Sequence, residues 1–195
     1  MDGKSNWYNG IAKQINQLKD TLSEKEYTKY KLRLLLCVAE RVAELSPECG
    51  LCQIFQQDIS TLTQGIGNII RVDDRDKRKA HLKTINGIIG HLRKKHKLVT
   101  EGYYMGIGLV FGTAIGIALG AAMPNIGTGI PIGVGFGMAM GAALDAKAKK
   151  EGRVICPSEK TASSPQKTKI AILIGLGVLF LGGLVAYMLV RNLPN

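Results

Sequence analysis

The chain has 195 residues and a formal net charge of +11, with 26 lysines and arginines against 15 acidic residues. Glycine is abundant, at 24 residues, and aromatic residues make up only 6%. The apolar residues gather in uncharged runs of about 18 residues or more, which is the length of a membrane-spanning helix and excludes a single soluble domain. A secreted disulfide scaffold does not fit either, because there are only four cysteines and no signal peptide is recognised.

The first hundred residues carry most of the charge, and their apolar positions recur at helical spacing. A short first helix is predicted from one apolar stripe: Trp7, Ile11, Ile15 and Leu18. A second helix is expected to begin at the capping-box sequence of residues 23–26, where hydroxyl and carboxylate satisfy each other's amides, and to end near Leu45. Its predicted inward positions are Leu35, Val38, Val42 and Leu45.

Two longer helices are predicted to follow. Ser46, Pro47 and Glu48 supply a cap, a first-turn proline and an acidic first turn for the third helix. Asp73 and Asp74 separate it from the fourth. The third stripe comprises Leu51, Phe55, Ile59, Leu62, Ile66 and Ile69, and the fourth comprises Leu82, Ile85, Ile89, Leu92, His96 and Val99. Because steps of three and four residues alternate, we expect antiparallel packing in a small, all-α bundle.

Glycine recurs every fourth residue in two uncharged runs, which predict membrane spans over residues 103–123 and 126–144 with a tight turn between them. The two rows are Gly108, Gly112, Gly116 and Gly120, then Gly129, Gly133, Gly137 and Gly141. Helices gain no hydrophobic energy by associating inside lipid, so close backbone contact through glycine is their main attraction. We therefore predict that these glycines form a helix-packing site.

The glycine rows leave three structures open. In the first, the glycines only pack the two spans against each other in one hairpin. In the second, glycines on the outer surface also bring copies of the chain together, around a pore. In the third, the two runs form a buried hairpin in a soluble protein. The glycine row and the basic sequence that follows it, over residues 127–153, resemble the small glycine-zipper membrane proteins of prokaryotes, most of which are uncharacterised. The resemblance extends over about residues 102–153, and it implies a membrane hairpin without a specific activity.

A third span is predicted over residues 170–190, an uncharged run close to the C-terminus. The expected organisation is therefore a cytoplasmic helical bundle over residues 1–100, a glycine-zipper membrane hairpin over 101–145, a basic cytoplasmic linker over 146–169, and a C-terminal transmembrane helix over 170–190.

Basic residues flank one side of the predicted spans. Twelve of them lie just before the first span or after the second, against Arg191 alone on the opposite side: Lys83, Arg93, Lys94, Lys95, Lys97, Lys147, Lys149, Lys150, Arg153, Lys160, Lys167 and Lys169. This bias predicts a multi-pass protein of the cell membrane with a cytoplasmic N-terminal domain and an external C-terminus. No nucleic-acid motif accompanies the charge, so we expect contact with lipid headgroups. The predicted contacts are Lys94, Lys95, Lys97, Lys147, Lys149, Lys150 and Arg153.

Cys49 and Cys52 form a CxxC pair at the start of the third helix. If the third and fourth helices are antiparallel, His96 faces this pair, and Cys37 or Cys156 would complete a zinc site. The alternatives are buried thiols beside an ordinary histidine, or a redox dithiol. A reducing cytoplasm predicts free thiols in the absence of metal. His81 and His91 receive no predicted role.

No catalytic motif emerges from the sequence, and the predicted spans lack charged residues at their centres, which argues against a proton relay or a carrier of charged substrates. We therefore expect a non-enzymatic membrane anchor, adaptor or assembly subunit, with a homo-oligomer or another membrane protein as partner. The alternatives are an oligomeric channel or pore packed by the glycine rows, and a metal or redox sensor built on the CxxC pair.

Overall fold

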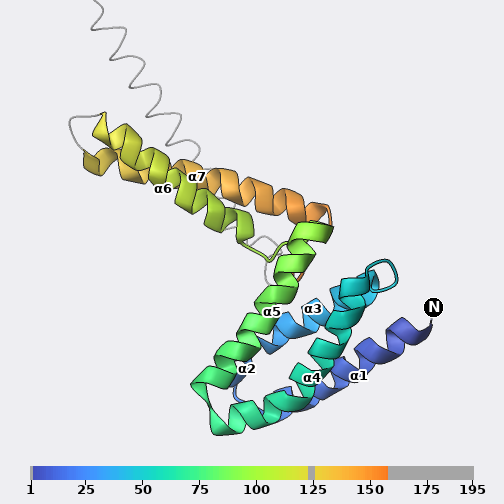
Figure 1. The fold of residues 1–195 in the computed structure, drawn as a ribbon. Coiled ribbons are helices and arrows are strands. Elements are labelled where there is room, and N and C mark those ends of the chain that lie inside the picture. Colours follow the sequence, from blue (N-terminus) through green and yellow to red (C-terminus); the bar gives the residue numbers. More distant parts are fainter. Residues whose placement is uncertain (1, 123–125, 158–195) are drawn as a thin grey trace, which may run out of the picture. The chain divides into compact units, whose positions relative to one another are not determined.

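The computed structural model describes residues 2–122 and 126–157, and almost all of these are helical (Figure 1). The helices are α1 (Asp2–Thr21), α2 (Glu24–Lys29), α3 (Leu32–Leu45), α4 (Gly50–Val72), α5 (Arg75–His96), α6 (Tyr103–Ala121) and α7 (Ile126–Lys150). Among these residues the only β pairing is an isolated bridge between Val99 and Val154. The all-α prediction is confirmed. The predicted third span lies outside the described residues, as does the second half of the predicted linker, residues 158–169.

Helices α1, α3, α4 and α5 share one apolar core. Fully buried members include Ile15, Leu35, Val38, Ile59, Ile66, Ile85 and Leu92, each contributed by a predicted stripe. Each such side chain is worth about 1.5–3 kcal/mol in burial. Leu51 departs from its stripe and is 52% exposed. Cys52 takes the inward position in the first turn of α4 instead.

Two of the predicted helix boundaries are confirmed by side-chain caps. The Ser23 hydroxyl accepts a hydrogen bond from the Glu26 amide, and the Glu26 carboxylate accepts one from the Ser23 amide. At the other break, Asp73 ends α4 in the left-handed conformation, and the Asp74 carboxylate accepts hydrogen bonds from the first amides of α5. These contacts satisfy amides that lack a partner within the helix.

The predicted second helix is wrong in one respect, because Tyr30 and Lys31 divide it into α2 and α3. Lys31 is left-handed, with a φ of 52°. Tyr30 is 1% exposed, its carbonyl oxygen lies 3.1 Å from Nε2 of the buried His81, and its hydroxyl donates to Asp73. Burial of this ring and its polar contacts favours a turn where apolar periodicity alone predicted a continuous helix.

The predicted cap of α4 is also wrong. The Ser46 hydroxyl donates back to the Ala43 carbonyl oxygen at 3.0 Å, so Ser46 ends α3. Cys49 is the extended residue that precedes α4. Val99 is likewise not helical, since α5 ends at His96 and Lys97 is left-handed. The Val99 amide donates to the Arg153 carbonyl oxygen at 2.8 Å, which ties the residues after α7 to those before α6.

Helices α6 and α7 form an antiparallel hairpin (Figure 1). Both are long and apolar enough to cross a membrane. α7 continues to Lys150, so the first residues of the predicted linker are helical. After α7 the chain returns to the bundle, where Ile155 is 1% exposed in the core.

Candidate functional site

The glycine rows of α6 and α7 face each other along the hairpin. Gly108, Gly112, Gly116 and Gly120 are the buried residues of α6, whereas the other residues of that helix are wholly or partly exposed. All four glycines of the second row are buried as well. The predicted packing residues are thus brought together as one continuous contact between two backbones.

The contact is too close for any side chain. A methyl group added at Gly116 would lie 2.8 Å from the Gly129 carbonyl oxygen, and one added at Gly141 would lie 2.6 Å from Met105 Cα. One added at Gly112 would overlap the Gly133 carbonyl oxygen. Such proximity maximises dispersion and permits Cα–H···O contacts, which favour helix association in lipid. By contrast, a methyl group at Gly106 or Gly135 would have no atom within 4 Å.

The outer surface of the hairpin consists of large apolar side chains. Val110 is 70% exposed, Phe111 63% and Phe136 60%. In each span only 22% of the most apolar 18-residue window is buried. A core helix of a soluble protein would be mostly buried, so the apolar faces of α6 and α7 have the character of lipid-exposed surfaces.

An acidic residue closes the open end of the hairpin. α6 begins after Gly102, which offers no side-chain cap. The Asp145 carboxylate of α7 instead accepts hydrogen bonds from the amides of Tyr104 and Met105, at 3.1 and 3.0 Å. This cap joins the two helices by a polar contact. The sequence carries no local signal for this cap, because Asp145 lies 42 residues after Tyr103 in the chain and helix caps are recognised only from neighbouring residues.

The predicted lipid-contacting residues lie at this same end. Lys94, Lys95 and Lys97 are exposed at the end of α5, and Lys147, Lys149 and Lys150 are exposed in the last turn of α7. Arg153 differs from them: its Nε donates to Glu151 at 2.6 Å, and an Nη contacts the Tyr104 hydroxyl at 3.4 Å. Tyr103 and Tyr104 begin α6, where aromatic residues commonly mark a membrane interface.

Four side chains of the types that can bind a metal ion converge between the N-terminus of α4 and the C-terminus of α5. They are Cys49, Cys52, His91 and His96, and their candidate ligand atoms all lie within 4.8 Å of one another. His91 Nε2 is 3.3 Å from Cys49 Sγ and 3.7 Å from Cys52 Sγ. His96 Nε2 is 3.6 Å from Cys52 Sγ. Both cysteines are buried and both histidines are partly buried. This group could hold a metal ion.

The surroundings of the cluster affect its protonation. The Cys52 amide hydrogen-bonds the Cys49 sulfur and is the main cause that lowers the pKa of Cys49. Burial raises the pKa of the Cys52 thiol to about 12. Burial, together with the charges of His96 and Lys95, lowers the pKa of His91 and so favours its neutral form. A neutral imidazole and a thiolate are the forms that bind metal, so the shifts at His91 and Cys49 favour binding, whereas the shift at Cys52 opposes it.

His91 received no role from the sequence, and the structure places it in this cluster. His91 and His96 form an H-x4-H pair, which is a zinc-binding spacing when it follows a CxxC. The signal was missed because 38 residues separate Cys52 from His91, whereas compact fingers have roughly 12–15. The antiparallel α4–α5 pair brings the motif's halves together. His81, by contrast, lies in the core against Tyr30.

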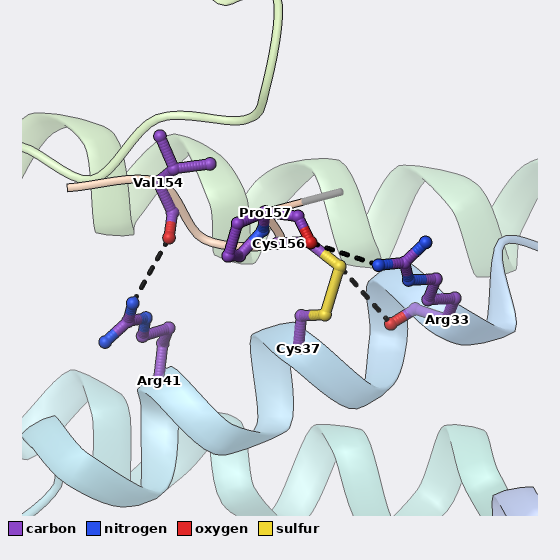
Figure 2. The surroundings of a disulfide bond; sticks show 6 residues. All are labelled: Arg33, Cys37, Arg41, Val154, Cys156 and Pro157. Atoms are coloured by element: carbon purple, nitrogen blue, oxygen red, sulfur yellow. Dashed lines mark hydrogen bonds between the residues drawn. A yellow bond between two sulfur atoms is a disulfide. The ribbon is translucent and has the colours of Figure 1, made fainter. Parts of the chain in front are cut away.

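The other two cysteines contradict two predictions, since they are neither free thiols nor candidate fourth ligands. Cys37 of α3 and Cys156 form a disulfide bond across 119 residues of sequence. Figure 2 shows Arg33 and Arg41 beside it, donating to the carbonyl oxygens of Pro157 and Val154 at 3.0 and 3.2 Å. The residues after α7 are therefore held on α3 by hydrogen bonds from arginine side chains to main-chain carbonyl oxygens as well as by the disulfide. Cys49 and Cys52 are the free cysteines of the described chain.

Comparison with known proteins identifies one segment. Residues 94–150 match a family described as glycine zipper membrane protein, as the sequence resemblance predicted. No curated protein matches the chain, and no solved structure does. The matched segment contains both glycine rows, the residues between them and the basic residues at the end of α7. Over residues 94–150 the chain is therefore similar to the glycine zipper membrane proteins, and it is a membrane protein.

Proposed function

We propose that the protein is a non-enzymatic membrane anchor or adaptor. The α6–α7 hairpin holds the helical bundle at the bilayer surface, and the bundle engages either a second copy of the chain or another membrane protein. The observation that carries this proposal is the hairpin itself, in which glycine faces glycine within the contact and large apolar side chains face outward.

The proposal extends to the orientation of the chain. The exposed lysines at the ends of α5 and α7 lie at the open end of the hairpin, where Tyr103 and Tyr104 begin α6. Basic residues are retained on the cytoplasmic side and attract anionic headgroups, at about 1 kcal/mol per charge near the surface. The bundle would then be cytoplasmic, and the turn between α6 and α7 would be external.

A pore formed by the same glycines is the weaker proposal. A ring of copies would need the glycine rows at its interfaces, yet each row is already buried against the other within one chain. A hydrated lumen also needs polar lining. The Thr113 hydroxyl donates to the Leu109 carbonyl oxygen of its own helix at 2.8 Å, and so contributes little to such a lining.

Two measurements on the full-length protein test the proposal. Extraction in a mild detergent should recover a stoichiometric partner or a homo-oligomer, and a uniform monomer without a partner would contradict the adaptor role. Reconstituted liposomes should stay impermeable to ions and small dyes. Leakage in proportion to protein content, abolished by Gly112→Leu but not by Gly106→Leu, would favour the pore instead.

A further inference from the structure

We propose that Cys49, Cys52, His91 and His96 form a structural zinc site that fastens the start of α4 to the end of α5. The proposal rests on the convergence of these four side chains and is independent of the proposed anchor or adaptor role. Two thiolates and two imidazoles are a ligand set typical of structural zinc.

The distances between the candidate ligands agree with one shared ion. With zinc bonds of 2.3 Å to sulfur and 2.0–2.1 Å to nitrogen, tetrahedral geometry places each sulfur about 3.5 Å from each nitrogen. Three of the four sulfur–nitrogen separations in the cluster are 3.3, 3.6 and 3.7 Å, and all four candidate ligand atoms lie within 4.8 Å of one another. A thiol–imidazole hydrogen bond would explain one such distance, but it does not explain why two thiols and two imidazoles converge on a common centre.

The ring orientations and the burial support the same conclusion. Both histidines turn Nε2 toward the sulfurs, and their rings meet edge to face at a centroid distance of 5.3 Å. Phe55 packs against the His91 ring on another side, at 5.4 Å. Because four protein ligands complete a tetrahedron, no position is left for water or substrate. The site is therefore structural rather than catalytic.

The position of the cluster defines what the metal would stabilise. His96 is the last residue of α5, and α6 begins only seven residues later. Between them, Val99 pairs with the segment after α7. Zinc at this point would hold the last turn of α5 against α4, directly before the chain enters the hairpin. Metal binding would thereby add its free energy to the folding of the bundle.

The first test uses the unmodified full-length protein, purified in detergent without chelator. We expect about one zinc per chain that survives gel filtration. Cys49 and Cys52 should resist alkylation until a strong chelator is added, and metal removal should lower the Tm of the bundle. Cobalt exchanged into the site should give the visible absorption of a tetrahedral thiolate complex. These readouts need no mutant and therefore remain decisive if a variant fails to fold.

The second test compares ligand variants with matched controls. Cys49→Ser with Cys52→Ser should abolish zinc binding. His91→Asn or His96→Asn should each weaken it by more than the 10–100-fold typical of losing a group that only hydrogen-bonds to a metal ligand. The double variant Cys37→Ser with Cys156→Ser, and the neighbouring Lys95→Gln, should retain one zinc per chain. Weakened zinc binding in His91→Asn would show that His91 is a ligand, and would exclude a site formed without that histidine.

Three results would overturn the proposal. The first is wild-type protein without stoichiometric zinc after supplementation. The second is folded, metal-treated protein whose two thiols react freely. The third is zinc that persists in the Cys49 and Cys52 variants but is lost in the Cys37 and Cys156 variants. Because metal content and thiol protection do not depend on lipid or partner, failure here leaves the anchor proposal untouched.

Discussion

Asp145 shows how a single side chain can fix the alignment of two helices. Its carboxylate accepts two amide hydrogen bonds from the first turn of α6, where the positive end of the helix dipole also favours an anion. We predict that Asp145→Ala destabilises the hairpin by about 0.5–2 kcal/mol, the usual cost of losing a helix cap. Asp145→Asn, which keeps an acceptor oxygen, should lose less. The SDS concentration that separates dye-labelled helix ends measures both effects, and equal losses would contradict the capping role.

Asp73 joins three elements of the bundle through its carboxylate. Lys29 Nζ and the Tyr30 hydroxyl each lie 2.7 Å from Oδ1, and Arg78 lies 3.4 Å from it. The hydrogen bond from Lys29 is the largest cause of a lowered pKa at Asp73. A lowered carboxyl pKa stabilises the folded state fully above the unfolded value of about 3.9, and that stability is lost as the pH falls further.

We therefore predict that Asp73→Asn narrows the difference in Tm between pH 6 and pH 3. Asparagine also tolerates the left-handed backbone at this position, so the α4 C-terminus should be preserved. Asp20→Asn, at an exposed position of α1, is the matched control and should leave the difference unchanged. If acidification from pH 6 to pH 3 lowers the Tm of Asp73→Asn and of the wild type by the same amount, the Asp73 carboxylate does not contribute to the pH dependence of stability.

At the residue scale, prediction from the sequence succeeded where positions could be counted along two neighbouring helices. Cys49, Cys52 and His96 were placed together by counting along two antiparallel helices. His91 was missed because 38 residues separate it from Cys52, far more than the roughly 12–15 that separate the two halves of a compact finger. The Cys37–Cys156 bond was beyond prediction, since it depends on where the chain returns after α7.

The hairpin is the element whose sequence most directly determines its packing. Gly112→Ala would overlap the backbone of α7, and we expect about 1–3 kcal/mol of overpacking cost. Gly106→Ala has open space in the same helix and is the matched control. The separation of dye-labelled helices in SDS reports the difference. Similar behaviour of the two variants would show that close glycine contact does not hold the spans together.

At the scale of elements, apolar periodicity predicted the long helices well and their ends less well. Asp73 and Asp74 marked a true break because each makes a local polar contact. The interruption at Tyr30 and Lys31 had no local signal. It depends on tertiary contacts with α4 and α5. Ser46 carried a cap signal in the sequence, yet its hydroxyl bonds back to α3 and closes that helix instead.

For the whole molecule, the charge bias and the disulfide point to opposite sides of the membrane for the bundle. The lysines at the hairpin's open end favour a cytoplasmic bundle, whereas the cytosol keeps most thiols reduced. We predict that Thr128→Cys, in a background with all four native cysteines replaced, is labelled only from outside the cell. We also predict that Cys37 and Cys156 are substantially reduced in cells that are acid-quenched before lysis.

Labelling of residue 128 only from within, together with a fully oxidised Cys37–Cys156 pair in quenched cells, would place the bundle on the opposite side of the membrane.

The division into bundle and hairpin could be predicted from the sequence alone, because charge and hydropathy change sharply near residue 100. The sequence did not indicate the return of residues 153–157 to the bundle, where Ile155 completes the core.

That return restricts how the protein is made. Two sulfurs can join only when they occupy the same compartment, so the number of membrane crossings between residues 37 and 156 must be even. The two apolar helices satisfy this parity. Cys156 follows both crossings in the chain, so the disulfide can form only after the second helix has been inserted. A chain that contains the disulfide has therefore completed the insertion of both helices. Cleavage of the turn by an external protease would then leave two fragments that separate only after reduction.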